Sequence, residues 1–218
     1  MPLRIAVLAS GRGSNLQAIV DAIDAGTLDA EVTGVWSDRG DAQALARARG
    51  AGIPARAMRP RDFADRPSHD SAMFDAIDAD DPDLIVCAGY MRLIGAHVLA
   101  SRAGRLINIH PSLLPAFKGL HTHQRALEAG VAEHGGSVHF VTAELDGGPV
   151  IAQARVPVLA DDDAARLAAR VLAREHPLLL ETLRWIAAGR VRWQADGVHV
   201  DGRMATAPLQ LAATDRFA

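Results

Sequence analysis

The segment "IAVLASGRGSN", residues 5–15, joins a short apolar run to a loop that contains two glycines. Residues 5–9 have the length and composition of a buried strand. After the loop, apolar residues recur at the spacing of one helical face, at Leu16, Ile19, Val20 and Ile23. The segment therefore predicts a strand, a loop and a helix, the first unit of an α/β fold.

The same alternation of strand and helix patterns continues along the chain. The run "DLIVCAG", residues 83–89, is apolar enough to be buried on both faces, as a central parallel strand is. Strands are also expected at 31–37, 53–57, 105–109, 136–145 and 148–158, and helices at 41–51, 67–80, 122–130 and 161–189. The pattern predicts one doubly wound, mostly parallel sheet with helices on both faces. Residues 1–218 are expected to form a single domain, with a C-terminal helix and a small hairpin within about 161–218.

Composition excludes several partners. The chain has 23 Lys and Arg against 26 Asp and Glu, so its net charge of −3 gives no positive field that would hold nucleic acid or an anionic membrane. No apolar run approaches the roughly 20 residues of a membrane span, and the start of the chain does not resemble a signal peptide. The single cysteine, Cys87, cannot form an internal disulfide. We expect a cytoplasmic protein that binds neither nucleic acid nor membrane.

The loop "SGRGSN" is a candidate anion site, because it would place free backbone N–H groups at the start of a helix. Gly13 permits close backbone approach, while Ser14 and Asn15 can donate hydrogen bonds or cap the helix. A dinucleotide motif would need glycine at Leu16, and the Gly-Lys-Ser/Thr of a P-loop is absent from the sequence. The loop fits a monophosphate better than a pyrophosphate, and a simple tight turn remains the alternative.

The segment "NIHPSLLP", residues 108–115, holds the second candidate site. Residues two apart in a strand point to the same side, so Asn108 and His110 can present their side chains together at its carboxyl end. An amide donor beside an imidazole of pKa about 6.5 can stabilise an oxyanion and move a proton. Asp146, in the turn "LDGGP", would orient the imidazole if the two residues met. Two alternatives are a buried histidine with an unrelated turn aspartate, and a zinc site with His121 and His123.

Five motifs occur in one order: "SGRGSNLQAI", "AGYMRLI", "NIHPSLLP", "GLHTHQRALEAG" and "SVHFVTAELDGGPVI". Together they resemble the phosphoribosylglycinamide formyltransferase family of the folate-dependent purine pathway, from the first strand to at least Val158. The resemblance implies a Rossmann-like α/β fold. It also implies formyl transfer from 10-formyltetrahydrofolate to the amine of glycinamide ribonucleotide, without a metal, and it leaves a homodimer open.

The resemblance also implies roles for particular residues. Asn108, His110 and Asp146 match the family's catalytic set, and Asn108 also matches a cofactor contact. The positions that match substrate contacts are Gly13, Ser14, Asn15 and Glu175, and those that match the folate pocket are Arg66, Met91, Arg92, Leu93 and Ile94. Some members carry glutamine three residues before the glutamate. This sequence has Leu172 there, which puts that polar contact in doubt.

Two related enzymes fit the sequence less well. Methionyl-tRNA formyltransferase adds a C-terminal tRNA-binding domain, which the residues after the last motif are too few to supply. Formyltetrahydrofolate deformylase carries an N-terminal regulatory domain, whereas the first strand here begins close to Met1. The functions that stay open beside the transferase are a 10-formyltetrahydrofolate hydrolase and a non-catalytic phosphate- or nucleotide-binding module.

Overall fold

Strand β1 (Leu3–Leu8) lies in the middle of a parallel sheet, and its residues from Ile5 onward are fully buried. The computed structural model describes residues 1–217 and divides into two units, Met1–Asn108 and Ile109–Ala218. In the first unit the strand order is β3-β2-β1-β4-β5, and every pairing is parallel. The other strands are β2 (Ala30–Ser37), β3 (Ala55–Ala57), β4 (Leu84–Cys87) and β5 (Leu106–His110), whose last residues continue into the second unit.

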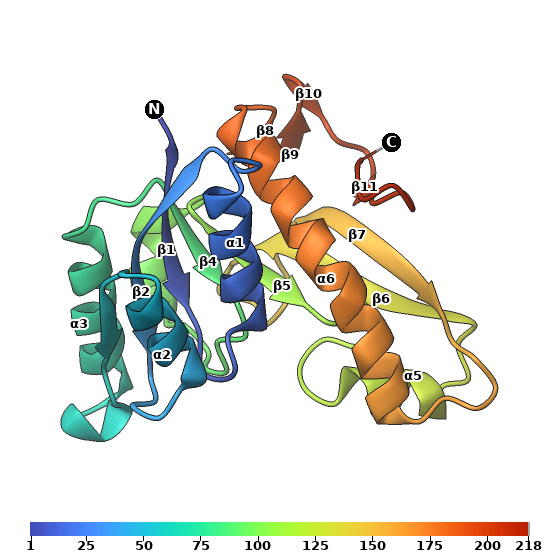
Figure 1. Ribbon diagram of the computed structural model, residues 1–218, viewed down its shortest axis with the longest axis horizontal. Helices are drawn as coiled ribbons and strands as arrows, with labels where there is room; N and C mark the ends of the chain where they lie inside the picture. The colour runs from blue at the N-terminus through green and yellow to red at the C-terminus, as the bar shows by residue number, and fades with distance from the viewer. Residues whose placement is uncertain (218) are drawn as a thin grey trace. The chain divides into compact units, whose positions relative to one another are not determined.

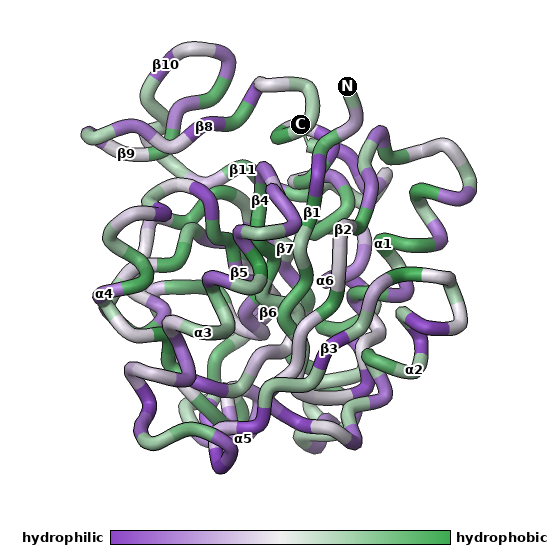
Figure 2. Tube along the Cα trace, turned by 90° about the vertical axis from the view of Figure 1, so that its left-hand side faces the viewer, coloured by the Kyte–Doolittle hydropathy of each residue, from purple (hydrophilic) through white to green (hydrophobic). Residues whose placement is uncertain are grey.

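Helices cover both faces of this first sheet. Figure 2 shows α1 (Ser14–Asp24) and α2 (Gln43–Gly50) on one side of the strands, and α3 (Arg66–Asp78) and α4 (Ala96–Leu99) on the other. Two 3-10 turns complete the unit, η1 (Pro60–Asp62) and η2 (Ala100–Arg102). The Asp65 carboxylate accepts a hydrogen bond from the Ser68 N–H at 2.8 Å, which caps α3 at its start.

The second unit is built on β6 (Glu133–Phe140) and β7 (Val150–Pro157), which pair antiparallel, while β11 (Leu209–Gln210) pairs parallel with β7. The long helix α6 (Ala164–Ala187) runs along β6 and β7 (Figure 1). Its residues Leu167 and Val171 are fully buried in a core cluster with α5 (Thr122–Glu128) and β7. A small antiparallel sheet follows, made of β8 (Val191–Gln194), β9 (Gly197–Val200) and β10 (Arg203–Met204).

The predicted fold class, a mostly parallel sheet with helices, is confirmed. Most strand boundaries differ from the prediction by one or two residues, and β6 differs more, because it begins at Glu133 and ends at Phe140 rather than covering 136–145. Glycine has low strand propensity, so Gly135 and Gly136 hid the start of the strand. An added Cβ at Gly135 would lie 1.9 Å from the Ala154 carbonyl oxygen, so only glycine fits this close strand pair. The expected single domain stays a prediction.

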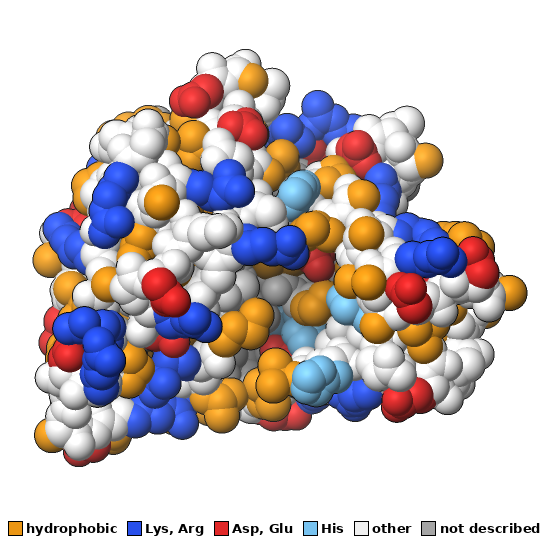
Figure 3. Space-filling view, turned by 60° about the horizontal axis from the view of Figure 1, so that its bottom comes forward, with side chains coloured by type: hydrophobic (Ala, Val, Ile, Leu, Met, Phe, Trp, Pro, Cys, Tyr) orange, Lys and Arg blue, Asp and Glu red, His pale blue; other side chains and the backbone are white. Residues whose placement is uncertain are grey.

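The charged side chains on the surface are mixed in sign, as the nearly balanced composition suggests. On the face shown in Figure 3, Lys and Arg side chains lie among Asp and Glu side chains. Among residues 1–217, no helix is both long enough and apolar enough to span a membrane.

Candidate functional site

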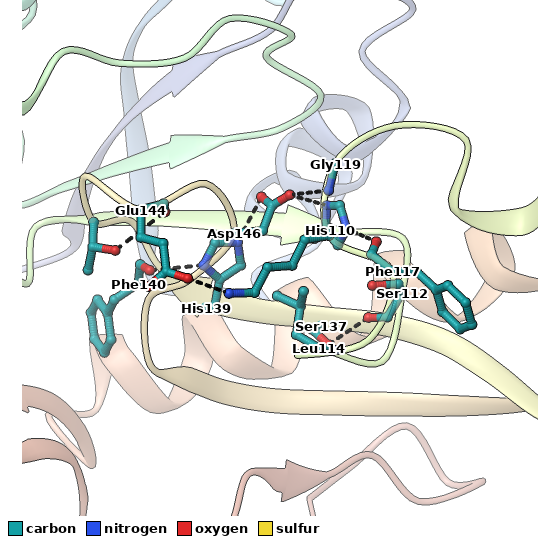
Figure 4. Close-up of polar contacts among 12 residues, drawn as sticks. His110, Ser112, Leu114, Phe117, Gly119, Ser137, His139, Phe140, Glu144 and Asp146 are labelled. Atoms are coloured by element: carbon teal, nitrogen blue, oxygen red, sulfur yellow. Dashed lines mark hydrogen bonds and ion pairs between the residues drawn. The ribbon is translucent and has the colours of Figure 1, made fainter. Parts of the chain in front are cut away.

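His110, the last residue of β5, has both ring nitrogens next to acceptors (Figure 4). Its Nδ1 lies 3.5 Å from Asp146 Oδ2, and its Nε2 lies 3.1 Å from the Phe117 carbonyl oxygen. Both neighbouring groups, a carboxylate and a carbonyl, are hydrogen-bond acceptors for the ring. The side chain is 8% exposed, so the ring lies largely out of water. Asn108 lies two residues earlier in the same strand and therefore points to the same side.

The position of the Asp146 carboxylate depends on the backbone conformation of Asp146 and on a hydrogen bond from the loop before α5. It has a φ of 45°, in the left-handed region that aspartate tolerates better than most residues. Its Oδ2 accepts a hydrogen bond from the Gly119 N–H at 2.8 Å. An added Cβ at Gly148 would lie 1.8 Å from the Phe140 carbonyl oxygen, so the chain after Asp146 requires glycine there. The structure thus brings Asp146 to His110, a meeting that sequence spacing could not show.

A second histidine, His139, lies on the other side of the Asp146 carboxylate. Its Nε2 is 3.7 Å from Asp146 Oδ1, and its Nδ1 is 2.9 Å from the Phe140 carbonyl oxygen. Burial lowers the pKa of His139, against the opposing effects of that carbonyl and of Asp146. Sequence reasoning missed this residue, although it stands near the carboxyl end of an apolar strand, as His110 does.

A buried polar network fixes the loop that faces His110. The Ser137 hydroxyl donates to the Ser112 carbonyl at 2.7 Å and accepts from the Leu114 N–H at 3.0 Å. The Gln153 amide donates to the Leu114 carbonyl at 2.8 Å. Because these groups lie on β6 and β7, the loop that carries the Phe117 carbonyl is attached to the sheet of its own unit.

His123 and His134 form an edge-to-face pair near this loop, with ring centroids 5.2 Å apart. His134 is fully buried on β6, and the ring of Phe117 lies 5.8 Å from it in the same kind of arrangement. Burial, and secondarily the neighbouring His123, lower the pKa of His134 to about 4. Among residues 1–217, no group of three His, Cys, Asp or Glu could hold a metal ion, so His121 and His123 do not complete a metal site with His110 there.

We expect this histidine pair to make the protein sensitive to acid. The folded-state pKa of His134 lies below its unfolded value of about 6.5, so the unfolded chain binds more protons between about pH 6.5 and about pH 4. Stability is therefore present above pH 6.5 and falls as the pH decreases through that window, by up to about 1.4 kcal/mol per pH unit. Urea unfolding of the wild type and His134→Phe at several pH values measures this slope. The slope should be shallower in His134→Phe. It should be unchanged in the control His97→Gln, which alters an exposed histidine. Equal slopes in all three proteins would exclude His134 as the cause.

The glycine loop lies in the first unit, where it opens α1. Gly13 is the N-cap with a φ of 72°, and an added Cβ there would lie 2.8 Å from both Ala44 Cα and Ala44 Cβ. Ser14 begins the helix, and Asn15 is buried. The Ser10 hydroxyl, just before the loop, donates to Asp38 at 2.6 Å and accepts from the Met91 N–H at 2.9 Å. The loop is thereby linked to residues 91–94.

Residues 91–94, after β4, expose two large apolar side chains. Met91 is 69% exposed and Leu93 is 53% exposed, so their apolar surfaces are accessible to a ligand. The Arg66 guanidinium donates to the Leu93 carbonyl at 2.7 Å. Arg92 has a buried Nε without a hydrogen-bond partner in the described structure, and Ile94 is half-buried.

Glu175 lies on α6 in the second unit and is buried. An added Cβ at Gly136 would lie 3.3 Å from Glu175 Cγ and 3.7 Å from the His110 carbonyl oxygen. Glycine on β6 therefore leaves room for the glutamate close to the end of β5. Leu172, one turn earlier, is half-buried.

Several known proteins are similar to this chain in sequence and in fold. Residues 3–183 match the formyl transferase family. The phosphoribosylglycinamide formyltransferase of Escherichia coli (strain K12) is 47% identical, over 92% of this chain and 95% of its own. The structure of the phosphoribosylglycinamide formyltransferase from Coxiella burnetii superposes with a TM-score of 0.90 at 48% identity, over 93% of this chain and 95% of its own. Glycinamide ribonucleotide transformylase 1 from Symbiobacterium toebii gives a TM-score of 0.88 at 46% identity, over 91% and 94%.

Proposed function

Because this chain belongs to the formyl transferase family, we propose that it transfers the formyl group of 10-formyltetrahydrofolate to the amine of glycinamide ribonucleotide in purine biosynthesis. The observation that carries the assignment of residues is the buried His110, next to the Asp146 carboxylate at the carboxyl end of a parallel strand. Such strand ends are where α/β sheets bind ligands.

The reaction needs stabilisation of one negative charge. The neutral amine of the substrate attacks the formyl carbon, and charge develops on the formyl oxygen. The Asn108 amide and the His110 imidazolium can both donate hydrogen bonds to that oxygen. The Asp146 carboxylate lies 3.5 Å from His110 Nδ1, where it faces the ring and can orient it.

Proton movement completes the transfer. The new bond joins the amine nitrogen to the formyl carbon, and the bond from that carbon to N10 of the folate breaks. The amine loses a proton and N10 gains one, so the atoms and charges balance. We assign this proton transfer to His110, which has the Asp146 carboxylate beside it. Holding the two substrates in register supplies further rate enhancement.

Binding roles are proposed for the following residues. Gly13, Ser14 and Asn15 lie at a helix start, where we propose that the phosphate of the ribonucleotide binds, and we propose that Glu175 also contacts this substrate. Arg66 and residues 91–94 are proposed to hold the folate, where the exposed Met91 and Leu93 suit its flat apolar ring. The homodimer and the cytoplasmic location expected from the sequence stay predictions.

The test is the change of cofactor absorbance with and without glycinamide ribonucleotide. A transferase consumes 10-formyltetrahydrofolate only when the ribonucleotide is present. Formate release without it would favour the hydrolase instead. A protein that binds the ribonucleotide but never consumes the folate would be a binding module.

Gly13→Val is expected to weaken glycinamide ribonucleotide at least about tenfold, which is about 1.4 kcal/mol, and to change folate affinity much less. The substitution loses the left-handed backbone conformation and forces side-chain atoms against Ala44. Calorimetric titration with each ligand measures the two affinities. Gly11→Val is the matched comparison, since an added Cβ at Gly11 meets nothing within 4 Å, and its effect should be smaller. Equal weakening of both ligands in Gly13→Val would contradict the assignment of the loop.

A further inference from the structure

The residues that fix the 91–95 segment include a buried carboxylate on α3. Asp70 is 3% exposed and lies one helical turn after Arg66. Its Oδ2 accepts a hydrogen bond from the Gly95 N–H at 2.9 Å and lies 3.5 Å from Arg66 Nε. From these contacts we propose that Asp70 is a positioning residue for folate binding, a role that rests on the proposed function.

Asp70 holds the segment at two points. One is direct, through the Gly95 N–H. The other passes through Arg66, whose Nη2 donates to the Leu93 carbonyl at 2.7 Å while its Nε faces the Asp70 carboxylate. An added Cβ at Gly95 would lie 3.1 Å from Asp70 Oδ2, so the backbone approaches the carboxylate closely. The exposed Leu93 therefore stands on a backbone that is fixed on both sides of Ile94.

His69 supports the carboxylate from the other side. Its ring is fully buried, with Nδ1 at 3.1 Å from Asp70 Oδ1 and Nε2 at 2.9 Å from the Met58 carbonyl oxygen. The Met58 carbonyl and the Asp70 carboxylate therefore hold the ring from two sides. The edge of the ring also meets Phe63, with centroids 5.2 Å apart. A buried carboxylate is retained where it is paired and hydrogen-bonded, and Asp70 has partners at both oxygens.

The functional consequence is preorganisation. Met91 and Leu93 are exposed, so burial of these two side chains does not stabilise the segment before a ligand binds. If the backbone were free, folate binding would have to order it, and that entropy would be subtracted from the affinity. With Asp70 in place, the backbone of residues 91–95 is ordered before the ligand binds. Removing the Asp70 carboxylate should therefore weaken the affinity for the folate and leave the affinity for the ribonucleotide unchanged.

Asp70→Asn tests this role, because asparagine keeps the size of the side chain but removes the charge that attracts Arg66. We expect the KM for 10-formyltetrahydrofolate to rise about tenfold, which corresponds to about 1.4 kcal/mol, and the KM for glycinamide ribonucleotide to stay within about twofold. Amide hydrogen exchange at residues 91–95 should be faster than in the wild type.

Asp78→Asn is the matched control for a loss of stability alone. Asp78 ends the same helix, and its Oδ2 lies 2.5 Å from Arg102 Nη2 and 3.0 Å from Arg102 Nε. We expect this variant to unfold at lower urea concentration while both KM values and the exchange at 91–95 stay unchanged. The proposal is overturned if Asp70→Asn leaves the folate KM and this exchange unchanged, or if both variants change alike. A wild type without ribonucleotide-dependent transfer would refute the proposed function, and the exchange comparison would then decide alone whether Asp70 orders the segment.

Discussion

Replacing Asn108 with alanine is expected to lower kcat about a hundredfold to a thousandfold, the usual loss for one oxyanion donor. Asn108 is half-buried near the end of β5, two residues before His110, so its amide donates from a rigid strand rather than from a loop. A donor in a rigid, water-poor site needs no reorganisation when charge appears on the formyl oxygen. The loss should fall mainly on kcat, because the charge exists only in the transition state.

Steady-state kinetics with both substrates measures this loss. Asn108→Asp is the matched variant, since it keeps the size of the side chain but replaces the amide donor with an acceptor, and it should be at least as slow as Asn108→Ala. Both variants should unfold at nearly the wild-type urea concentration. A folded Asn108→Ala protein with wild-type kcat would show that the amide does not stabilise the oxyanion.

Local rules explain how much of this site the sequence could predict. The two-residue period of a strand was enough to place Asn108 and His110 on one side of β5. The alternation of strand and helix patterns was enough for the parallel sheet, and the glycine loop was correctly expected between a strand and a helix. These features depend on neighbours in sequence, where periodicity is informative.

Contacts between distant residues could not be predicted in this way. The meeting of His110 with Asp146 depends on the left-handed backbone at Asp146 and on a loop that brings the Gly119 N–H to the same carboxylate. His139 joins them because β6 extends to Phe140. Asp70 gave no signal at all, since an aspartate near the start of a helix usually faces water, and only the packed structure shows it buried against Gly95.

His110→Ala and Asp146→Asn are each expected to lower kcat by at least about a hundredfold, within the range typical of general acid–base groups. In the proposed mechanism, His110→Ala removes both the donor to the formyl oxygen and the group that carries the proton. Asp146→Asn keeps the size of the side chain but removes the charge that lies 3.5 Å from the His110 ring, so the imidazolium loses its counter-charge.

The double variant distinguishes a joint role from two separate ones. If Asp146 acts through His110, its charge has little left to support once the imidazole is gone, and the combined loss in free energy is smaller than the sum of the two single losses. The wild type, both single variants and the double variant complete the cycle, with binding of each substrate checked by calorimetry. Asp146 also faces His139 at 3.7 Å, so His139→Gln with and without Asp146→Asn shows whether the carboxylate acts through that ring instead. Strict additivity between His110→Ala and Asp146→Asn, in folded proteins that still bind both substrates, would mean that Asp146 works independently of His110.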